Sequence, residues 1–161
     1  MKKIAFVVLG LAFLLLAQSL FAQTYYSNSY FSAKDGEYPE TYFPYTKRPV
    51  YMNNKTKFII AHEGDTYAAI AREMNIEEYD LRNYNDVVDW SYEPGIGEVV
   101  YLTHKRSKSK TLYHKIEEGE TLRGISQKYA INMKSLYKKN VKLGVPLTDM
   151  KPGDRICISC K

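Results

Sequence analysis

Residues 119–131 read Gly-Glu-Thr-Leu-Arg-Gly-Ile-Ser-Gln-Lys-Tyr-Ala-Ile, and residues 64–76 read Gly-Asp-Thr-Tyr-Ala-Ala-Ile-Ala-Arg-Glu-Met-Asn-Ile. The two stretches align without a gap at an offset of 55 residues, which is 119 minus 64. The alignment continues downstream, and a match kept in register over this length identifies an internal repeat. Equivalent pairs are Ile70 and Ile125, Ile76 and Ile131, Leu81 and Leu136, and Asn85 and Asn140.

Each copy of the repeat predicts the same small fold. Short runs at 58–61 and 112–116 predict a first strand, and residues 98–102 and 155–158 predict a closing strand. Near the closing strand the offset becomes 56, because one residue is inserted in a loop. The predicted fold class is α+β: two tandem small β-α-α-β modules, each with a two-stranded antiparallel sheet and two helices on one face.

Two helices are predicted between the strands of each copy. A threonine, Thr66 or Thr121, suits the N-cap of the first helix, and Asn75 suits the left-handed conformation that often ends a helix. A second, shorter helix is expected over 79–84 and over 133–137. The first helix has apolar or small residues at i, i+3, i+4 and i+7, the spacing of one helical stripe: Tyr67, Ile70, Ala71 and Met74, and then Leu122, Ile125, Ser126 and Tyr129.

The first residues predict export. Met1-Lys2-Lys3 precedes 14 uncharged apolar or small residues, Ile4–Ala17, and Leu20-Phe21-Ala22 then provides a small residue. This order is typical of a signal peptide over 1–22, so an exported protein of the periplasm or cell envelope is expected. The run is shorter than the roughly 20 residues that span a bilayer, so no stable membrane span is expected after cleavage. Cleavage leaves 161 − 22 = 139 residues and lowers the net charge from +5 to +3.

Two segments flank the first copy. Residues 23–57 are rich in Tyr and Pro and show no helical or strand period, which predicts an extended arm lying on the first module. A tyrosine-rich surface for stacking carbohydrate is the alternative. Residues 105–111, with basic residues from Lys105 to Lys110, predict a solvated linker; contact with anionic cell-surface polymers is the second interpretation. The mild net charge does not favour a nucleic-acid partner.

Both copies resemble the LysM family, over residues 58–104 (module 1) and 112–159 (module 2). The resemblance rests on Gly-Asp-Thr or Gly-Glu-Thr, an Ile one turn later, a Leu and an Asn in the second helix, and a Pro-Gly before the last strand. The chain is also similar to the C-terminal tail of exported bacterial glucosaminidases that end in paired LysM modules, around residues 48–58. Because this sequence leaves no room for a catalytic domain in front of that stretch, a free-standing binding part that works beside such an enzyme is expected.

The resemblance implies non-catalytic binding of N-acetylglucosamine-containing cell-wall glycan, either peptidoglycan or a chitin-like oligosaccharide. A shallow groove at one end of each module would hold N-acetyl groups against backbone N–H and C=O groups, and Tyr67 would pack on a sugar ring. Two linked modules would raise avidity by ~10²–10⁴ over one module, with the linker setting their spacing. The positions carried over as glycan-binding are Gly64, Asp65, Thr66, Tyr67, Asn85, Asp86, Val87, Gly119, Glu120, Thr121, Leu122, Asn140, Val141 and Leu143.

Other functions are weighed against this one. The rival is an envelope protein–protein adaptor that holds a cell-wall hydrolase. A glycosidase needs two carboxylates across a cleft, whereas Glu117, Glu118 and Glu120 fall on one predicted turn. No enzyme, cofactor or metal site is therefore expected, and His62, His104 and His114 lack metal-ligand spacing.

The two cysteines, Cys157 and Cys160, leave their redox state open. An exported protein favours a disulfide, but Cα atoms three residues apart in a strand are about 10 Å apart, beyond the ~7 Å limit for a bridge. An internal bond therefore requires a bend after Ile158. A free Cys160, or a bond from it to another chain, is the alternative.

Overall fold

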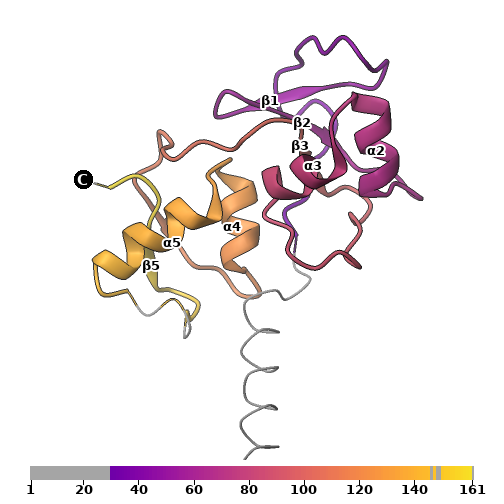
Figure 1. Ribbon diagram of the computed structural model, residues 1–161. Coiled ribbons are helices and arrows are strands. Elements are labelled where there is room, and N and C mark those ends of the chain that lie inside the picture. The colour runs from indigo at the N-terminus through magenta and orange to yellow at the C-terminus, as the bar shows by residue number, and fades with distance from the viewer. Residues whose placement is uncertain (1–29, 146, 148–149, 161) are drawn as a thin grey trace, which may run out of the picture.

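The computed structural model describes residues 30–145, 147 and 150–160 (Figure 1). The expected signal peptide, 1–22, and the start of the arm, 23–29, lie outside the described residues. The chain folds into two small α+β modules that lie side by side, with the arm on the first and the C-terminus on the second (Figure 1).

Module 1 contains a sheet and two helices. Its strands are β2 (Thr56–Ile60) and β3 (Val99–Tyr101), which pair antiparallel, and its helices are α2 (Tyr67–Met74) and α3 (Glu78–Tyr84). A further strand, β1 (Tyr51–Asn53), joins β2 through a hairpin, so this sheet has three strands where two were predicted. The hairpin forms because Asn54 and Lys55 both adopt positive φ (47° and 61°), as a two-residue turn of this kind requires.

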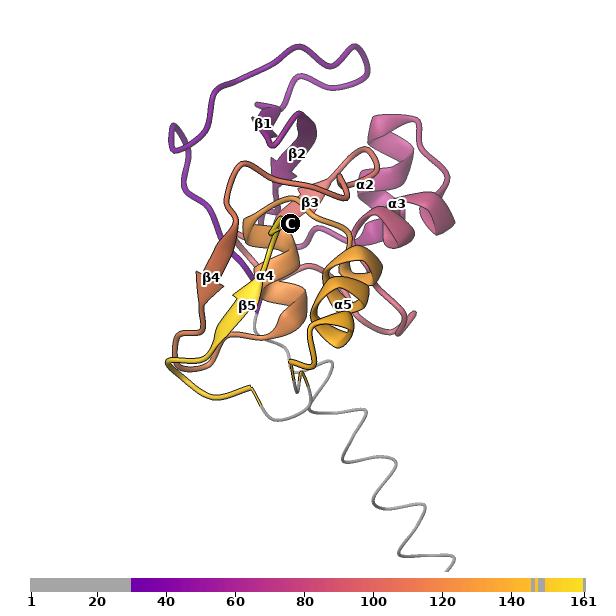
Figure 2. The ribbon, with the colours of Figure 1, turned by 90° about the vertical axis from the view of Figure 1, so that its left-hand side faces the viewer.

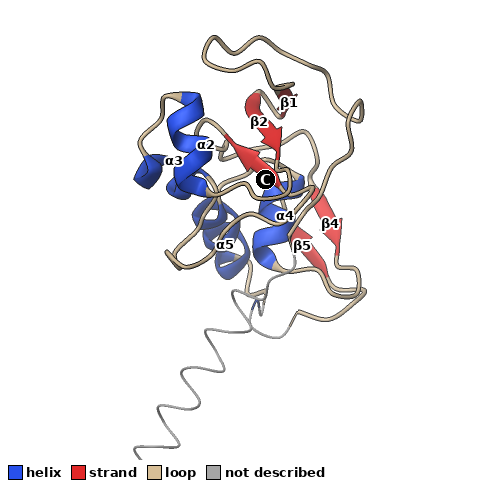
Figure 3. Ribbon diagram, turned by 90° about the vertical axis from the view of Figure 1, so that its right-hand side faces the viewer, coloured by secondary structure: helices blue, strands red, loops and turns tan. Residues whose placement is uncertain are grey.

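Module 2 repeats this plan with two strands. Strands β4 (Tyr113–Lys115) and β5 (Arg155–Cys157) pair antiparallel beside α4 (Leu122–Lys128) and α5 (Met133–Lys142), as Figure 2 shows. The predicted α+β fold of two β-α-α-β modules is confirmed, and helices and sheets segregate clearly in Figure 3. Strand register also follows the repeat. Each pair of strand partners in module 1 has its equivalent in module 2. Phe58 with Tyr101 corresponds to Tyr113 with Cys157, Ile59 with Val100 to His114 with Ile156, and Ile60 with Val99 to Lys115 with Arg155.

Side-chain caps start the first helix of each module. Thr66 Oγ1 accepts from Ala69 N–H (3.1 Å), and Thr121 Oγ1 accepts from Gly124 N–H (3.0 Å), as the N-cap prediction required. Asn75 ends α2 at φ 53°, in the predicted left-handed conformation. The apolar stripes behind these caps form a separate core in each module, with Tyr67, Ile70 and Met74 fully buried in the first and Ile125, Ile131 and Leu136 in the second.

The arm covers both edges of the module 1 sheet. Residues 31–33 form backbone hydrogen bonds with residues 97–99 beside β3, and residues 39–41 form them with residues 50–52 beside β1. Figure 2 follows this indigo segment around the outside of the sheet. Because an uncovered edge strand invites pairing with other chains, the arm protects module 1 from such association. Tyr51 from the arm is buried beside Phe58, with ring centroids 5.6 Å apart.

The basic linker is not uniformly solvated. The side chain of Lys105 has no exposed surface, which contradicts the expectation for this residue, whereas Arg106, Lys108 and Lys110 are exposed. Lys105 is buried because its ammonium pairs with Asp86 (2.5 Å) and donates to side chains of α4. Buried contacts between the modules therefore set their spacing, and the linker does not act as a free tether.

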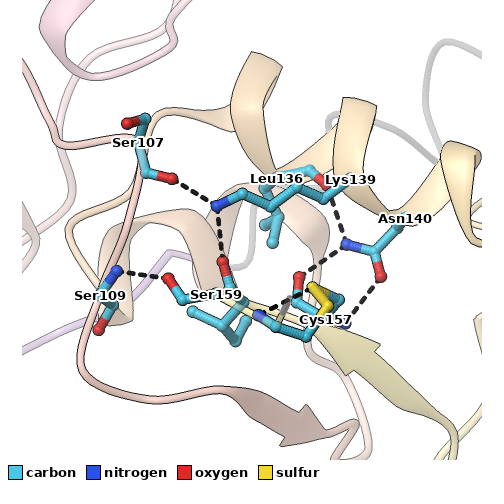
Figure 4. Close-up of a disulfide and its surroundings, with 9 residues drawn as sticks. Ser107, Ser109, Leu136, Lys139, Asn140, Cys157 and Ser159 are labelled. Carbon is cyan, nitrogen blue, oxygen red and sulfur yellow. Dashed lines mark hydrogen bonds between the residues drawn. A yellow bond between two sulfur atoms is a disulfide. The ribbon is translucent and has the colours of Figure 1, made fainter.

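The cysteines form an internal disulfide. Cys157 and Cys160 are bonded, with Cα atoms 5.5 Å apart, so the chain bends after β5 as an internal bond requires. Figure 4 shows the surroundings of this bend, where Lys139 of α5 donates to the carbonyl oxygens of Ser107 and Ile158. The disulfide and Lys139 thus hold the end of the chain against α5 and the linker.

Candidate functional site

The turn before the first helix has the same geometry in both modules. Gly64 and Gly119 are exposed at φ +80° and +77°, with open space where a Cβ would stand. The acidic residue that follows closes the turn, because Asp65 Oδ2 accepts from His62 N–H (2.7 Å) and Glu120 Oε2 accepts from Glu117 N–H (2.9 Å). The turn itself therefore requires the glycine and the acid, independently of any ligand.

Basic side chains hold both acids in place. Arg48 donates two hydrogen bonds to Asp65 (2.7 and 3.2 Å). Glu120 contacts His114 Nε2 (2.5 Å) and Lys128 Nζ (3.0 Å). Burial opposes ionisation of both carboxyls, but hydrogen bonds from the turn and from the basic partners outweigh it and lower the pKa of Asp65 and of Glu120. Both carboxylates are thus fixed as structural anions.

The equivalent asparagines clamp the second helix to the closing strand. Asn85 Nδ2 donates to Leu81 O (2.8 Å) and Tyr101 O (2.9 Å), and its Oδ1 accepts from Tyr101 N–H (2.8 Å). Asn140 makes the same three bonds with Leu136 and Cys157, at 2.8, 2.8 and 2.7 Å (Figure 4). Both asparagines are fully buried. These two positions therefore hold the fold and offer no surface to a sugar.

The structure also differs from expectation at Val141, Leu143 and Tyr67. Asn140 and Val141 lie within α5, which runs to Lys142, and Leu143 is its C-cap, so these residues do not start a loop. Val141 and Leu143 are exposed (51% and 55%). The Tyr67 ring is fully buried and does not offer the expected stacking surface, because Tyr67 starts the apolar stripe of α2.

A carboxylate fills the site beside the start of α2 in module 1. Glu93, from the loop after α3, accepts from Tyr67 N–H through Oε2 (2.6 Å) and from Arg82 through Oε1 (2.9 Å). Arg82 is itself held by Glu78 (2.8 Å) and lies over the rings of Tyr67 and Trp90, with centroid distances of 4.7 and 5.0 Å. The first amide of α2, one of the groups that a helix leaves without an internal partner, is therefore occupied by the chain itself.

Module 2 differs from module 1 at three of these positions. At the offset of 55, Leu122 corresponds to Tyr67, Met133 to Glu78 and Tyr137 to Arg82. Within the described part of the chain, no residue accepts a hydrogen bond from Leu122 N–H. A tyrosine therefore replaces the guanidinium of Arg82, and the Tyr137 side chain is 42% exposed. The positions equivalent to Glu93, which are 148 at the offset of 55 and 149 at the offset of 56, lie outside the described residues.

A pocket of about 310 Å³ lies at this place in module 2. Its floor comes from α4 and α5, and its rim comes from the loop after α3 of module 1, so we name it the junction pocket. Its size falls at the lower end of the range for small-ligand sites. The lining combines apolar and polar side chains: Asn83, Asp86, Val87, Val88, Leu122, Met133, Lys134 and Tyr137.

Buried ion pairs fix the pocket by joining the modules. Arg123 of α4 donates to Glu98 Oε1 (2.7 Å), whose side chain has no exposed surface. The second pair joins Lys105 to Asp86, and Asp86 also accepts from Ser126 Oγ (2.9 Å). Burial lowers the pKa of Lys105, while Asp86 opposes that shift. Asp86 was expected to contact glycan; its carboxylate binds module 2, and it lines the pocket together with the expected site residues Val87 and Leu122.

Sequence reasoning missed the residues that distinguish the modules. Arg82, Glu93 and Tyr137 were not among the candidates, because none belongs to a shared motif. The available signal was the difference between the copies, since an arginine in one second helix corresponds to a tyrosine in the other. No cluster of three or more His, Cys, Asp or Glu suited to a metal occurs among the described residues. Likewise, none of the helices in the described ranges has the length and apolar character to cross a membrane.

Comparisons with known proteins agree with the repeat. The chain is 22% identical over 102 residues to membrane-bound lytic murein transglycosylase D of Escherichia coli K12, and equally to that of E. coli O6:H1. These matches cover 61% of this chain but only 22% of each relative's length. Among solved structures, the spore cortex-lytic enzymes SleL of Bacillus cereus and Bacillus megaterium match 65% of this chain and 23% and 22% of theirs. Their identities are 17% and 19%, and their TM-scores are 0.28 and 0.26.

The family comparison covers both modules. Residues 62–91 and 114–159 match the LysM domain model. The first match covers the turn, α2 and α3, and the second runs from β4 through β5. Together with the two β-α-α-β folds, these matches identify the chain as a protein with two tandem LysM domains, a family that generally binds peptidoglycan.

Proposed function

We propose that this protein binds N-acetylglucosamine-containing cell-wall glycan without catalysing a reaction, and that module 2 is the principal binding module. The LysM family supports the choice of ligand. The relative named as a membrane-bound lytic murein transglycosylase supports a place in the cell envelope, where the chain would work beside such an enzyme.

One observation carries the choice of module. In module 1, Glu93 occupies the first amide of α2 and is held there by Arg82. In module 2 the equivalent residue is Leu122, which lines the junction pocket, and no described residue accepts from its N–H. A ligand carbonyl, such as that of an N-acetyl group, could accept from this amide at the start of α4. Entry to module 1 would first require displacement of a carboxylate that makes two charge-assisted or backbone hydrogen bonds.

The lining of the junction pocket suits an acetylated sugar. Leu122 and Met133 offer apolar surface to a methyl group or a ring face, and Val88 is exposed (63%) on the rim. Tyr137 adds an aromatic ring with a polar hydroxyl, a combination that packs on a sugar and stays hydrated. Module 1 would serve as a brace that supplies this rim.

The absence of catalysis is part of the proposal. The Glu120 carboxylate accepts from Glu117 N–H and contacts both His114 and Lys128, so its oxygens are engaged by the protein. A glycosidase instead needs a proton donor and a second carboxylate that face one bond across a cleft. Among the described residues that line the junction pocket, Asp86 carries the one carboxylate, and this side chain is bound to Lys105.

The test is retention of residues 23–161 on protein-free peptidoglycan, chitin and cellulose. We expect retention on the first two and not on cellulose. Tyr137→Ala should lower the affinity about tenfold, because an aromatic contact contributes roughly 1 kcal/mol beyond its buried area. Tyr79→Ala is the matched control, because Tyr79 is an exposed tyrosine (64%) on the second helix of module 1.

Two outcomes would contradict the proposal. If Tyr137→Ala and Tyr79→Ala lower retention on peptidoglycan equally, module 2 is not the principal binding module. No retention of the unaltered protein on peptidoglycan or chitin would refute glycan binding altogether. Binding only to envelope extracts that contain protein would then favour the adaptor function.

A further inference from the structure

A second concave site lies between the hairpin, the linker and the end of α4. It has a volume of about 850 Å³, and we name it the basic cleft. The turn between β1 and β2 forms one wall, residues 106–111 form the opposite wall, and Lys128 and Tyr129 close one end. Figure 1 follows the linker from β3 past this hairpin to module 2. Among the described residues, no acidic side chain lines the cleft, and five cationic side chains do: Lys55, Arg106, Lys108, Lys110 and Lys128.

The walls of the basic cleft are fixed by hydrogen bonds. Asn54 Nδ2 donates to Lys108 O (2.8 Å), which ties the hairpin turn to the linker. Asn53 Nδ2 donates to Lys128 O (3.0 Å), which ties the hairpin to the end of α4. The backbone of Arg106 pairs with residues 130–132 on both its N–H and C=O sides. The cations therefore project from a defined backbone frame, including the three that lie in the linker, Arg106, Lys108 and Lys110.

The charges of the cleft are poorly compensated. Lys128 pairs with Glu120 (3.0 Å). The other ion pairs among the described residues involve none of Lys55, Arg106, Lys108 and Lys110. Like charges that share a concavity repel one another, and the same concavity focuses their field and concentrates anions. An anionic ligand would relieve this repulsion.

The other lining groups suit oxyanions. Ser107, Ser109 and Thr111 provide hydroxyl groups between the basic residues of the linker. Hydroxyls can donate hydrogen bonds, and Arg and Lys recognise carboxylates and phosphates. The volume far exceeds that of one oxyanion, and the cations come from three separate chain segments. A chain-like ligand with repeated negative charges matches this layout better than a single small anion.

We propose that the basic cleft binds a polyanion of the cell envelope that presents carboxylates or phosphates along a flexible chain. This site is separate from the junction pocket, because Leu122 lies at the start of α4 and Lys128 at its end. Seven residues of helix separate the two ends by roughly 10 Å. The protein can therefore hold an anionic polymer and a glycan at the same time.

The test compares two variants with matched loss of charge. The cleft variant is Lys55→Gln, Arg106→Gln, Lys108→Gln and Lys110→Gln. The control removes three exposed lysines and one exposed arginine outside the cleft: Lys34→Gln, Lys47→Gln, Arg72→Gln and Lys138→Gln. Both variants of residues 23–161 lose four charges, so a difference between them reports position and not net charge.

Binding is measured at low salt with two probes, polygalacturonate for carboxylates and linear polyphosphate for phosphates. The unaltered protein should bind at least one of them, and the cleft variant should bind it about tenfold or more weakly, since each exposed ion pair contributes a factor of roughly 1.5 to five. The control should keep most of the affinity, and added salt should weaken binding steeply. The preferred probe identifies the ligand chemistry.

Independent outcomes separate this proposal from glycan binding. Retention on chitin should be the same for the cleft variant and the unaltered protein. If neither polyanion binds at low salt, or if the control variant loses as much affinity as the cleft variant, the basic cleft is not a binding site. Either result leaves the junction pocket unaffected.

Discussion

The ion pair between Arg123 and Glu98 should be among the most costly single contacts to break. Glu98 has no exposed surface, and its Oε1 accepts from Arg123 Nη2 at 2.7 Å. Its Oε2 accepts from Tyr92 OH (2.6 Å) and Gly95 N–H (3.0 Å), so the carboxylate is fully engaged. Arg123→Met removes the cation and leaves the carboxylate buried without a counter-charge. Breaking one partner of such a pair costs about 3–5 kcal/mol.

The assay is urea unfolding of residues 23–161, followed by circular dichroism. With a slope of about 2 kcal/mol/M, a loss of 3–5 kcal/mol would lower the midpoint by about 1.5–2.5 M. The pair joins the modules, so both modules should lose stability in one transition. Arg72→Met is the control, because Arg72 is exposed on α2 and donates only to Ala68 O (3.3 Å); it should cost less than about 0.5 kcal/mol.

The double variant Arg123→Met with Glu98→Gln tests whether the unpaired charge causes the loss of stability. Replacement of both charges removes the unpaired buried anion, so most of the lost stability should return. A loss of less than about 1 kcal/mol for Arg123→Met would refute the reasoning. A double variant as unstable as the single one would do the same, because the cost would then come from lost contacts of the arginine stem and not from charge.

Four further predictions address the occluded site, the clamp, the disulfide and the arm. Glu93→Ala frees the first amide of α2, so it should restore glycan retention to a Tyr137→Ala protein; unchanged retention would mean that the carboxylate does not block module 1. Asn140→Ala leaves two buried backbone groups, the N–H and C=O of Cys157, without their side-chain partner and should cost about 2–4 kcal/mol in urea unfolding. Cys160→Ser opens a four-residue loop and should cost about 2 kcal/mol relative to the oxidised protein, with no added effect of reductant. Burial and a hydrogen bond to Asp35 raise the pKa of Tyr51 to about 12, above the usual 10, so its contribution to stability is complete below pH 10 and is lost as pH rises toward 12; Tyr51→Phe should flatten this alkaline loss in unfolding measurements across that range.

Local signals predicted most of the fold. Thr66 and Thr121 cap their helices as expected, because an N-cap depends on one side chain and an amide three residues later. The offset of 55 also predicted which strand residues pair, since antiparallel register follows from equal spacing in both copies. Helix ends were less well predicted: α5 extends to Lys142, five residues beyond the expected end at 137, because Asn140 bonds inside the helix and to β5.

Long-range contacts account for most of what could not be predicted. Lys105 belongs to a run of charged residues that by itself indicates solvent. Its burial depends on Asp86 from one module and on Ser126 and Gln127 from the other. The arm is similar, because its prolines and tyrosines exclude a helix but do not identify the sheet edges that residues 31–33 and 39–41 cover. Neither partner is close in the chain, and composition carries no information about distance in space.

The two copies explain why the expected site residues were mostly structural. A residue type found at the same position in both modules tends to serve what the modules share, which is the fold. Gly64 and Gly119 adopt the same positive φ, and Asn85 and Asn140 make the same three bonds. Family motifs consist of such positions. A binding site predicted from the motifs alone therefore contains mostly residues that form turns, cap helices or join a helix to a strand.

Positions that differ between the copies carry the information on ligand access. Arg82 holds a carboxylate over the first amide of α2, whereas Tyr137, its equivalent, borders an open pocket. The Arg82 arrangement has a cost, since a buried guanidinium must be satisfied by Glu78 and Glu93 together. Module 2 has Met133 and Tyr137 at the positions of Glu78 and Arg82, so these two members of the network belong to module 1. This difference fits the proposed role of module 1 as a support, whose loop after α3 lines the junction pocket.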